Sequence, residues 1–340
     1  MPDCSSSFVE VLYTGGTIGM QPSSTGLVPA TGFEARAREA QREREEAEIA
    51  RWRLRELEPL IDSANMTPAH WRRLVEATLL AVDEGASGVL ILHGTDTLAY
   101  SAAALSFQLL GIEVPVVITG AMLPAGVTGS DAWENFFDGL RAVAVAPPDR
   151  LTVQFHGQSF AGVSCRKVMS HGREAFLPAL AASGRLQTTS LPDALRARAE
   201  RRPARVAVVE LFPGITAAQL EGMLAGEVEG LVLECYGSGT APSEDQALIA
   251  VLEQACARGV LVVAISLCHG GGVSLSTYAA GSRLAQIGVI GGGAMTREAA
   301  LGKLHWLLGS ELSAAQRRDW LARDVLGERG ESIQPAGVSC

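Results

Sequence analysis

The chain has 340 residues, a formal net charge of −9 and a hydrophobic fraction of 47%. This length is typical of two domains, each large enough to bury a core without disulfides or metals. The excess of acidic residues and an aromatic content of 5% leave few groups that could bind phosphates or stack on bases, so we expect no nucleic-acid partner.

The N-terminus has neither the basic stretch nor the apolar run of a secretory signal. The longest apolar runs are interrupted before they reach the roughly 18 residues that a membrane span needs. The six cysteines form no C-x-x-C pair, which favours reduced thiols over a disulfide framework. We therefore expect a soluble cytoplasmic protein with no membrane partner and, because Cys and His lack zinc-binding spacings, no metal.

In the first half of the chain, short runs of Val, Ile and Leu alternate with longer amphipathic stretches. This alternation is typical of a parallel sheet with helices on both faces. We expect strands over residues 8–13, 88–93, 114–119 and 151–155, and helices over residues 98–110 and 131–145. A further helix should begin at Pro68, with Thr67 as its N-cap, and end near Gly85. The Arg- and Glu-rich segment 34–58 is expected to form a surface helix leading into a strand near Trp52.

In the second half, residues 184–203 lose the apolar runs and gather Ser, Thr, Pro and Arg, as linkers do. We place a larger N-terminal α/β domain at 1–190, the linker at 191–204 and a smaller C-terminal α/β domain at 205–340. Further strands are expected over residues 205–212, 230–235 and 260–267. Ser/Thr-x-x-Gln capping boxes predict helix starts at Thr216, Ser243 and Ser313.

Ligands of doubly wound sheets bind at the carboxyl ends of the strands. Three predicted strands end in glycine and threonine, at residues 14–19 (TGGTIG), 93–97 (HGTDT) and 119–122 (TGAM). Glycines let backbone N–H groups approach a ligand, and threonine hydroxyls can donate, accept or attack. The glycine-rich stretches match no phosphate-binding template, and the G-x-S-x-G elbow is absent. What remains is a threonine, Thr17, in a glycine turn.

Lys167 and Lys303 are the two lysines among 28 basic residues; the other 26 are arginines. Arginine stays protonated at physiological pH, whereas a lysine that is partly buried or beside another cation can act as a base. Lys167 has such a neighbour in Arg166. Genome bias is the alternative explanation. For Lys303, on a helix predicted over residues 296–308, we expect a solvated or packing role.

Structural interpretations also exist for the other polar residues. Asp96 could cap the helix predicted from Leu98, and Thr17 could only stabilise its turn. Asp62 and Ser63 could form only the turn before the next helix. The histidines that we expect to be packed or hydrogen-bonded are His93, His156 and His269.

Four segments together resemble the motifs of the bacterial-type L-asparaginases, specifically their cytoplasmic type I branch: residues 13–20 (YTGGTIGM), 62–68 (DSANMTP), 91–100 (ILHGTDTLAY) and 117–120 (VITG). The resemblance continues through residues 236–242 (YGSGTAP), 278–281 (YAAG) and 288–292 (GVIGG), so it covers nearly the whole chain. It implies a two-domain asparaginase-like α/β fold, with a larger, mostly parallel N-terminal sheet flanked by helices. It also implies a homodimer or homotetramer. We expect no cofactor.

That family hydrolyses the side-chain amide of L-asparagine to aspartate and ammonia through an acyl-threonine. By resemblance, Thr17 is the nucleophile. Thr95 is the second catalytic threonine, which orients or activates water, and Lys167 is the amine coupled to it. The glycine turns, with Gly16 and Gly94, can supply the N–H donors that an oxyanion needs.

The resemblance also assigns the substrate contacts. Asp96 would hold the α-amino group of asparagine and Ser63 its α-carboxylate, with Asp62 supporting the turn. The sequence departs from the family at Leu27, where a tyrosine usually follows the nucleophile, and at Ala64, often a serine. Residues 162–166, just before Lys167, and residues 177–179 also lack the usual RGNR and SPN patterns. A cysteine of the type I allosteric site matches Cys268, but the arginine expected there is Glu234, so we predict no such regulation.

Three functions follow. The first is an asparagine amidohydrolase. The second is the amidase subunit of a tRNA-dependent amidotransferase, which usually has an extra N-terminal domain, whereas here 16 residues precede Thr17. The third is a non-catalytic amino-acid-binding protein, suggested by Leu27.

Overall fold

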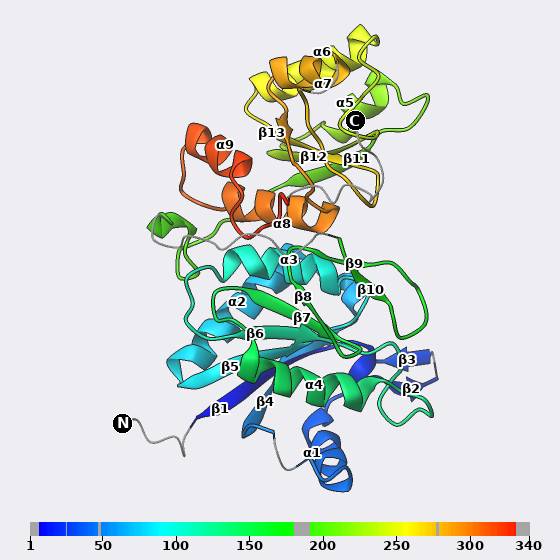
Figure 1. The fold of residues 1–340 in the computed structure, drawn as a ribbon, viewed down its shortest axis with the longest axis vertical. Helices are drawn as coiled ribbons and strands as arrows, with labels where there is room; N and C mark the ends of the chain where they lie inside the picture. Colours follow the sequence, from blue (N-terminus) through cyan, green and yellow to red (C-terminus); the bar gives the residue numbers. More distant parts are fainter. Residues whose placement is uncertain (1–6, 25, 47–48, 180–190, 277–278, 331–340) are drawn as a thin grey trace, which may run out of the picture. The chain divides into compact units, whose positions relative to one another are not determined.

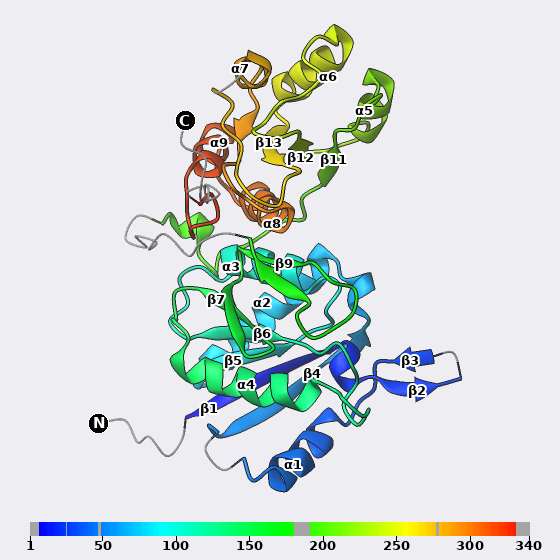
Figure 2. The same ribbon diagram turned by 45° about the vertical axis from the view of Figure 1, so that its right-hand side comes forward.

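The computed structural model describes residues 7–24, 26–46, 49–179, 191–276 and 279–330. Its contacts divide the chain into two compact units, Met1–Pro178 and Ala179–Cys340. Each unit is an α/β structure built on a parallel or mostly parallel sheet (Figures 1 and 2). Within the described ranges, no helix has both the length and the apolar character needed to cross a membrane.

The N-terminal unit contains a six-stranded sheet in the order β4-β1-β5-β6-β7-β8. Its strands are β1 (Phe8–Gly15), β4 (Trp52–Ile61), β5 (Ala86–Leu92), β6 (Val116–Thr119), β7 (Leu151–Phe155) and β8 (Gln158–Ala161). Neighbours from β4 to β7 are parallel, and β8 is antiparallel to β7. The predicted α/β class and the strands predicted in this half are confirmed. Short antiparallel pairs outside the sheet are β2 (Gln21–Ser23) with β3 (Gly26–Val28), and β9 (Cys165–Lys167) with β10 (Phe176–Pro178).

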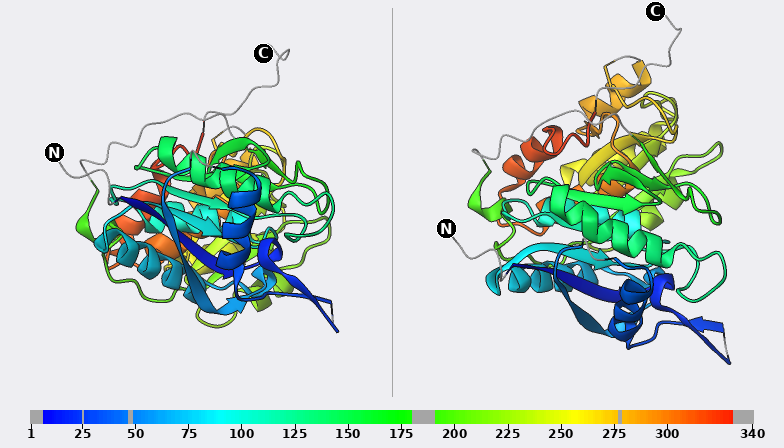
Figure 3. Two further views of the ribbon diagram at one scale, coloured as in Figure 1. Left: turned by 90° about the horizontal axis from the view of Figure 1, so that it is seen from below. Right: turned by 60° about the horizontal axis from the view of Figure 1, so that its bottom comes forward.

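Helices cover both faces of this sheet, as the strand pattern predicts (Figures 1 and 3). One face carries α1 (Phe33–Glu43) and α4 (Ala132–Val145), and the other carries α2 (Pro68–Asp83) and α3 (Leu98–Gln108). Successive β1 residues point to opposite faces. Val11 packs in the core that contains Phe33 and Phe136, whereas Leu12 packs in the core that contains Leu74.

The outer strand β4 is joined to β1 by ion pairs as well as by backbone hydrogen bonds. Glu10 on β1 lies opposite Arg53 on β4 and is 1% exposed. Its carboxylate accepts from Arg53 Nε at 2.5 Å and from Arg55 Nε at 2.8 Å. Both arginines also pair with Glu84, after α2. The surface helix and the strand predicted in this segment are confirmed as α1 and β4.

The C-terminal unit has a parallel sheet in the order β11-β12-β13-β14. Its strands are β11 (Val206–Glu210), β12 (Gly230–Cys235), β13 (Leu261–Ser266) and β14 (Ile290–Gly291), and its helices are α5 (Ala217–Met223), α6 (Gln246–Ala257), α7 (Ala279–Gln286), α8 (Arg297–Leu308) and α9 (Ala314–Ala322). The three strands predicted here are confirmed. So are the capping boxes at Thr216 and Ser313.

The capping box predicted at Ser243 is wrong. Helix α6 begins at Gln246 and its N-cap is Asp245, whose carboxylate accepts from Leu248 N at 3.0 Å. Asp245 directly precedes the helix, so its carboxylate can accept a hydrogen bond from an N–H group of the first turn. Ser243 instead donates its own N–H to Ala241 O at 2.7 Å, within the preceding turn.

The segment between the predicted domains is packed where the structure describes it. Of the predicted linker region, residues 184–190 lie outside the described residues. Leu195 is buried, and its carbonyl accepts from Trp306 Nε1 on α8 at 3.1 Å. Arg202 N donates to Gly309 O at 3.0 Å. Residues 191–202 thus belong structurally to the C-terminal unit, although their composition resembles that of a linker.

Lys303 on α8 has no exposed side-chain surface and forms an ion pair with Glu328 at 2.5 Å. Its amine also donates to Leu321 O at 3.3 Å, and the Glu328 carboxylate accepts from the N–H groups of Val325 and Leu326. Of the two roles expected for Lys303, the packing role is confirmed and the solvated role is wrong. Its role is to tie the segment after α9 to α8.

Candidate active site

The carboxyl ends of β4, β1 and β5 lie together where the strand order of the larger sheet reverses. β1 lies between β4 and β5, and the chain passes from β1 to β4 through α1 and from β4 to β5 through α2, on opposite faces of the sheet. Such a switch point opens a crevice between the connections, and ligands of open α/β sheets bind there. The segments that start at this edge are residues 16–19, 62–65 and 93–97.

Glycines bring these three segments into backbone contact. A Cβ atom on Gly16, whose φ is +79°, would lie 2.4 Å from Gly94 N. A Cβ atom on Gly94 would lie 2.5 Å from Ser63 Oγ. No side chain fits in either place. The structure therefore brings Gly16, Ser63 and Gly94 together.

Thr17 opens a short 3-10 turn, Thr17–Gly19, and is half-buried. The turn is held from two sides: Ala125 N donates to Ile18 O at 3.2 Å, and Arg36 Nη2 on α1 donates to Gly19 O at 3.0 Å. Sequence reasoning missed Arg36 as a support of this turn. Its place among many arginines of a surface helix gave no signal.

The hairpin β2–β3 follows this turn and projects from the unit (Figure 2). Its base, just after β3, is fixed by Tyr13, whose hydroxyl donates to Ala30 O at 3.1 Å. Burial raises the pKa of Tyr13 to about 12, so the hydroxyl keeps its proton. Leu27 lies on β3 opposite Pro22, and it is 48% exposed. It has no hydroxyl with which to polarise a nucleophile.

Lys167 reaches this edge from β9. Its Nζ donates to Thr95 Oγ1 at 3.0 Å and to Asp96 Oδ1 at 2.6 Å. Thr95 is 6% exposed, whereas the Asp96 side chain is 65% exposed. The amine thus lies between a buried hydroxyl and an accessible carboxylate. Three of the residues predicted as catalytic are therefore in contact.

Asp96 does not cap α3, so the structural interpretation of this residue is wrong. The N-cap position belongs to Thr97. Thr97 Oγ1 donates to Ser63 O at 2.8 Å and so joins the segment after β4 to the segment after β5. Ser63 is 3% exposed, and Asp62 Oδ1 accepts from Ala64 N at 3.1 Å, which stabilises this turn. Sequence reasoning missed Thr97, although its hydroxyl at a strand end was a usable signal.

The segment after β6, residues 120–122, is stabilised by Asn135 on α4, which is 1% exposed. Its Nδ2 donates to Gly120 O at 3.0 Å, and its Oδ1 accepts from His156 N at 2.9 Å. Asp131 accepts from Met122 N at 3.0 Å. Sequence reasoning missed Asn135. An amide on the apolar side of a predicted helix was the available signal.

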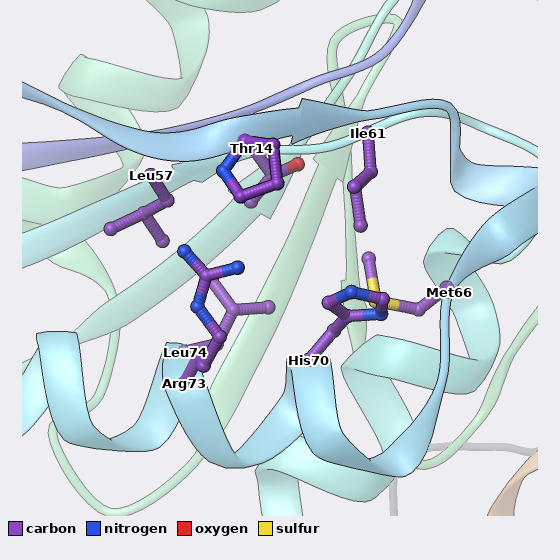
Figure 4. A pocket seen from close by; sticks show the side chains of 8 residues that line it. Thr14, Leu57, Ile61, Met66, His70, Arg73 and Leu74 are labelled. Carbon is purple, nitrogen blue, oxygen red and sulfur yellow. The ribbon is translucent and has the colours of Figure 1, made fainter.

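A small pocket lies beside the Ser63 turn, between β4 and α2, where the His70 ring points toward Ile61 and lies beside Met66 (Figure 4). Its volume of about 20 Å³ is room for little more than a water molecule. An amino acid does not fit there, so the strand ends are the better candidate. No group of three or more His, Cys, Asp or Glu side chains that could hold a metal occurs in the described parts of the chain.

Comparisons with known proteins found matches over nearly the whole chain. Residues 8–191 match the family model "Asparaginase, N-terminal", and residues 205–321 match the model "Glutaminase/Asparaginase C-terminal domain". L-asparaginase 1 of Escherichia coli (strain K12) is 36% identical over 330 residues, covering 94% of this chain and 97% of that protein. The crystal structure of L-asparaginase I from Vibrio cholerae matches with a TM-score of 0.82 and 34% identity, covering 95% of this chain and 98% of the other. A glutamyl-tRNA(Gln) amidotransferase subunit of Pyrococcus furiosus is 32% identical, covering 94% of this chain and 76% of that protein.

Proposed function

Since this chain belongs to the asparaginase family and is a hydrolase acting on amide bonds, we propose that it converts L-asparagine and water to L-aspartate and ammonia through an acyl-threonine. The observation that carries this proposal is the 3.0 Å contact between Lys167 Nζ and Thr95 Oγ1. It couples an amine to a hydroxyl at the sheet edge that also presents Thr17, and a hydroxyl nucleophile needs such a base. The proposed reaction uses no cofactor.

In the first step, Thr17 Oγ1 attacks the side-chain carbonyl carbon, its proton passes to the departing nitrogen, and the C–N bond breaks to release ammonia. In the second step, water attacks the acyl group and breaks its bond to Thr17, which regains a proton as aspartate leaves. Thr95 and Lys167 relay these protons, because a lysine can exist as a neutral amine. Backbone N–H groups of the turns at Gly16 and Gly94 stabilise the oxyanion.

The substrate is held through its charged ends. The Asp96 carboxylate is accessible, and it suits the α-ammonium group of asparagine. Ser63 lies against Gly94 and offers its hydroxyl to the α-carboxylate, while Asp62 stabilises the turn that presents it. Lys167 Nζ donates to the Asp96 carboxylate, so the substrate ammonium must share this carboxylate with the lysine.

A component of an amidotransferase is the alternative function, because a glutamyl-tRNA(Gln) amidotransferase subunit is among the relatives. The chain covers 97% of the E. coli L-asparaginase 1 but 76% of the P. furiosus amidotransferase subunit. Turnover without tRNA or a partner chain separates these two functions. Asparagine binding without turnover over hours would instead favour the non-catalytic amino-acid-binding protein.

We propose a cytoplasmic homodimer or homotetramer whose small-molecule partner is L-asparagine, because these are properties of the type I branch that its motifs resemble. Light scattering on the purified protein measures the assembly. A monomer at assay concentrations would contradict it.

The proposal is tested by ammonia release from asparagine and, in parallel, from glutamine. Thr17→Ala and Thr95→Ala should each lower kcat by about a thousandfold or more. Thr31→Ala, at an exposed threonine of the same region, is the control and should keep activity. Mass spectrometry after acid quenching should detect the acyl group on the peptide that contains Thr17. Full activity of Thr17→Ala would reject Thr17 as the nucleophile.

A further inference from the structure

His93 is the residue that joins β5 to the Gly94 turn, and it has no exposed surface. Its N–H donates to Thr119 O at 2.9 Å, which extends the β5–β6 pairing by one residue. Its carbonyl lies against Gly120, where a Cβ atom would be 2.3 Å from His93 O. The backbone of His93 is therefore held by the end of β6. The position from which the His93 side chain extends is therefore fixed.

The ring of His93 has a defined proton. Nδ1 lies 2.7 Å from Gly94 O, and a carbonyl oxygen can only accept, so Nδ1 carries the hydrogen. Nε2 is buried and has no hydrogen-bond partner among the described residues. Burial lowers the pKa of His93 to about 4, so the ring is neutral near pH 7. A buried ring whose one proton is committed to a carbonyl is not placed to exchange protons with a substrate.

The hydrogen bond from His93 Nδ1 to Gly94 O restrains a glycine, the residue type with the greatest backbone freedom. Gly94 must lack a side chain because Ser63 lies against it, and a glycine leaves its adjoining peptides free to rotate. The peptide after Gly94 carries Thr95, whose hydroxyl accepts from Lys167. A rotation of this peptide would redirect the hydroxyl. Something other than a side chain at position 94 must therefore restrain it.

We propose that His93 is a positioning residue that, through Nδ1–H and the Gly94 carbonyl, fixes the Gly94–Thr95 peptide and so directs the Thr95 hydroxyl toward Lys167. This inference rests on the proposed function of Thr95. Misplacing a reacting group by about 1 Å costs on the order of 100-fold in rate. The loss should fall on kcat, because His93 touches neither the Asp96 carboxylate nor the Ser63 hydroxyl in any hydrogen bond that the structure describes.

Three substitutions separate the two ring nitrogens. His93→Asn keeps an amide N–H near the place of Nδ1, His93→Gln moves the amide toward the place of Nε2, and His93→Leu keeps the volume without a donor. We expect His93→Leu and His93→Gln to lower kcat by about 10- to 100-fold with KM within about threefold. His93→Asn should stay within about threefold of the parent. Thermal unfolding shows whether His93→Leu and His93→Asn are equally stable, so that a folding defect is not read as a catalytic one.

Two outcomes would overturn the inference: a parental kcat for His93→Leu, or a His93→Asn variant as impaired as His93→Leu at equal stability. A measurement without turnover distinguishes these from a failure of the proposed function. NMR of the full protein with ¹⁵N-labelled histidine, assigned by loss of one signal in His93→Gln, should find His93 as the neutral Nδ1–H tautomer at pH 7. An Nε2–H tautomer or an imidazolium would overturn the assignment even if every variant were inactive.

Discussion

The Lys167 amine lies 3.0 Å from the Thr95 hydroxyl, although 72 residues separate the two in the chain. If this amine works as a base, a guanidinium cannot replace it, because arginine does not lose its proton. We expect Lys167→Arg to lower kcat by about 100-fold or more, the range of general-base catalysis. Ammonia release at saturating asparagine measures the change.

Arg166, the neighbour of Lys167 on β9, provides the control. Successive side chains of a strand point to opposite faces, so Arg166→Lys should keep kcat within about threefold. A parental kcat in Lys167→Arg would show that protonation of this amine is not part of the reaction.

Asp96→Asn tests the carboxylate that Lys167 contacts. Without its charge, the site loses the partner of the substrate ammonium. We expect kcat/KM for asparagine to fall by about 100-fold, while hydrolysis of succinamic acid, which lacks the α-amino group, falls far less. The ratio of the two kcat/KM values is the readout. Asp62→Asn keeps an oxygen for Ala64 N and should leave this ratio unchanged; an unchanged ratio in Asp96→Asn would refute the assignment.

Gly16→Ala and Gly32→Ala separate a backbone clash from backbone strain. The two glycines have similar φ angles, +79° and +74°, but a Cβ atom on Gly32 meets nothing within 4 Å. Gly32→Ala should therefore keep activity and lower the free energy of unfolding by about 1 to 2 kcal/mol, the cost of placing alanine in the left-handed conformation. Gly16→Ala must also push the Gly94 backbone away and should abolish activity. Steady-state assays and thermal unfolding of both variants measure the difference, and equal behaviour would contradict the close approach of the turns.

Lys303→Met tests the buried ion pair of the C-terminal unit. It leaves the Glu328 carboxylate without its cation and should lower the free energy of unfolding by about 3 to 5 kcal/mol. Lys303→Met/Glu328→Gln removes the charge while keeping an oxygen for the nearby N–H groups, and it should recover part of this loss. Denaturant unfolding followed by the fluorescence of Trp306 and Trp320, which pack together in this unit, measures both. A double variant no more stable than Lys303→Met would contradict the ion-pair role.

The same pair predicts a dependence on pH. Burial alone raises the pKa of Glu328, but the Lys303 ammonium and the Leu326 N–H outweigh it and hold the pKa below its ordinary value of 4.5. A lowered carboxyl pKa stabilises the fold above pH 4.5, and this contribution is lost as the pH falls through the folded-state pKa. In Lys303→Met the sign reverses, since the unpaired carboxylate favours protonation. The stability gap between this variant and the parent should therefore narrow on lowering the pH from 7 toward 5.

Leu27→Tyr restores the hydroxyl that the family usually has in this hairpin. If the missing hydroxyl limits activation of Thr17, kcat should rise by about tenfold. Val28→Tyr, on the next residue of β3 and on its other face, is the control and should give no gain. No gain in Leu27→Tyr would mean that another residue does this work.

The elements that organise the site could be predicted from the sequence. Short runs of Val, Ile and Leu predict β1, β5, β6 and β7, and parallel strands carry their carboxyl ends to one edge of the sheet. The meeting of the segments that contain Thr17, Ser63 and Asp96 follows from that rule and from the glycines between them. It needs no knowledge of side-chain geometry.

Other features depend on contacts that no local pattern encodes. Lys167 reaches Thr95 from β9, a strand of three residues, which is too short for an alternation of apolar and polar positions to be visible. Arg36 supports the Thr17 turn from a helix in which many side chains are arginine. The choice of Asp245 over Ser243 as a cap was settled by where α6 begins, and helix ends are the least certain part of a sequence-based prediction.

The outer strand β4 also bears on how copies of the chain can associate. An open strand edge is a template for further strands, and proteins protect such edges with charged side chains and proline. β4 contains Pro59, which lacks an N–H, and it contains Arg53 and Arg55, whose side chains form ion pairs with Glu10 on β1. Continuing the sheet from one copy into the next would have to break this arrangement. Assembly of several copies should therefore use other surfaces. The same features of β4 should oppose fibrous aggregation through this edge.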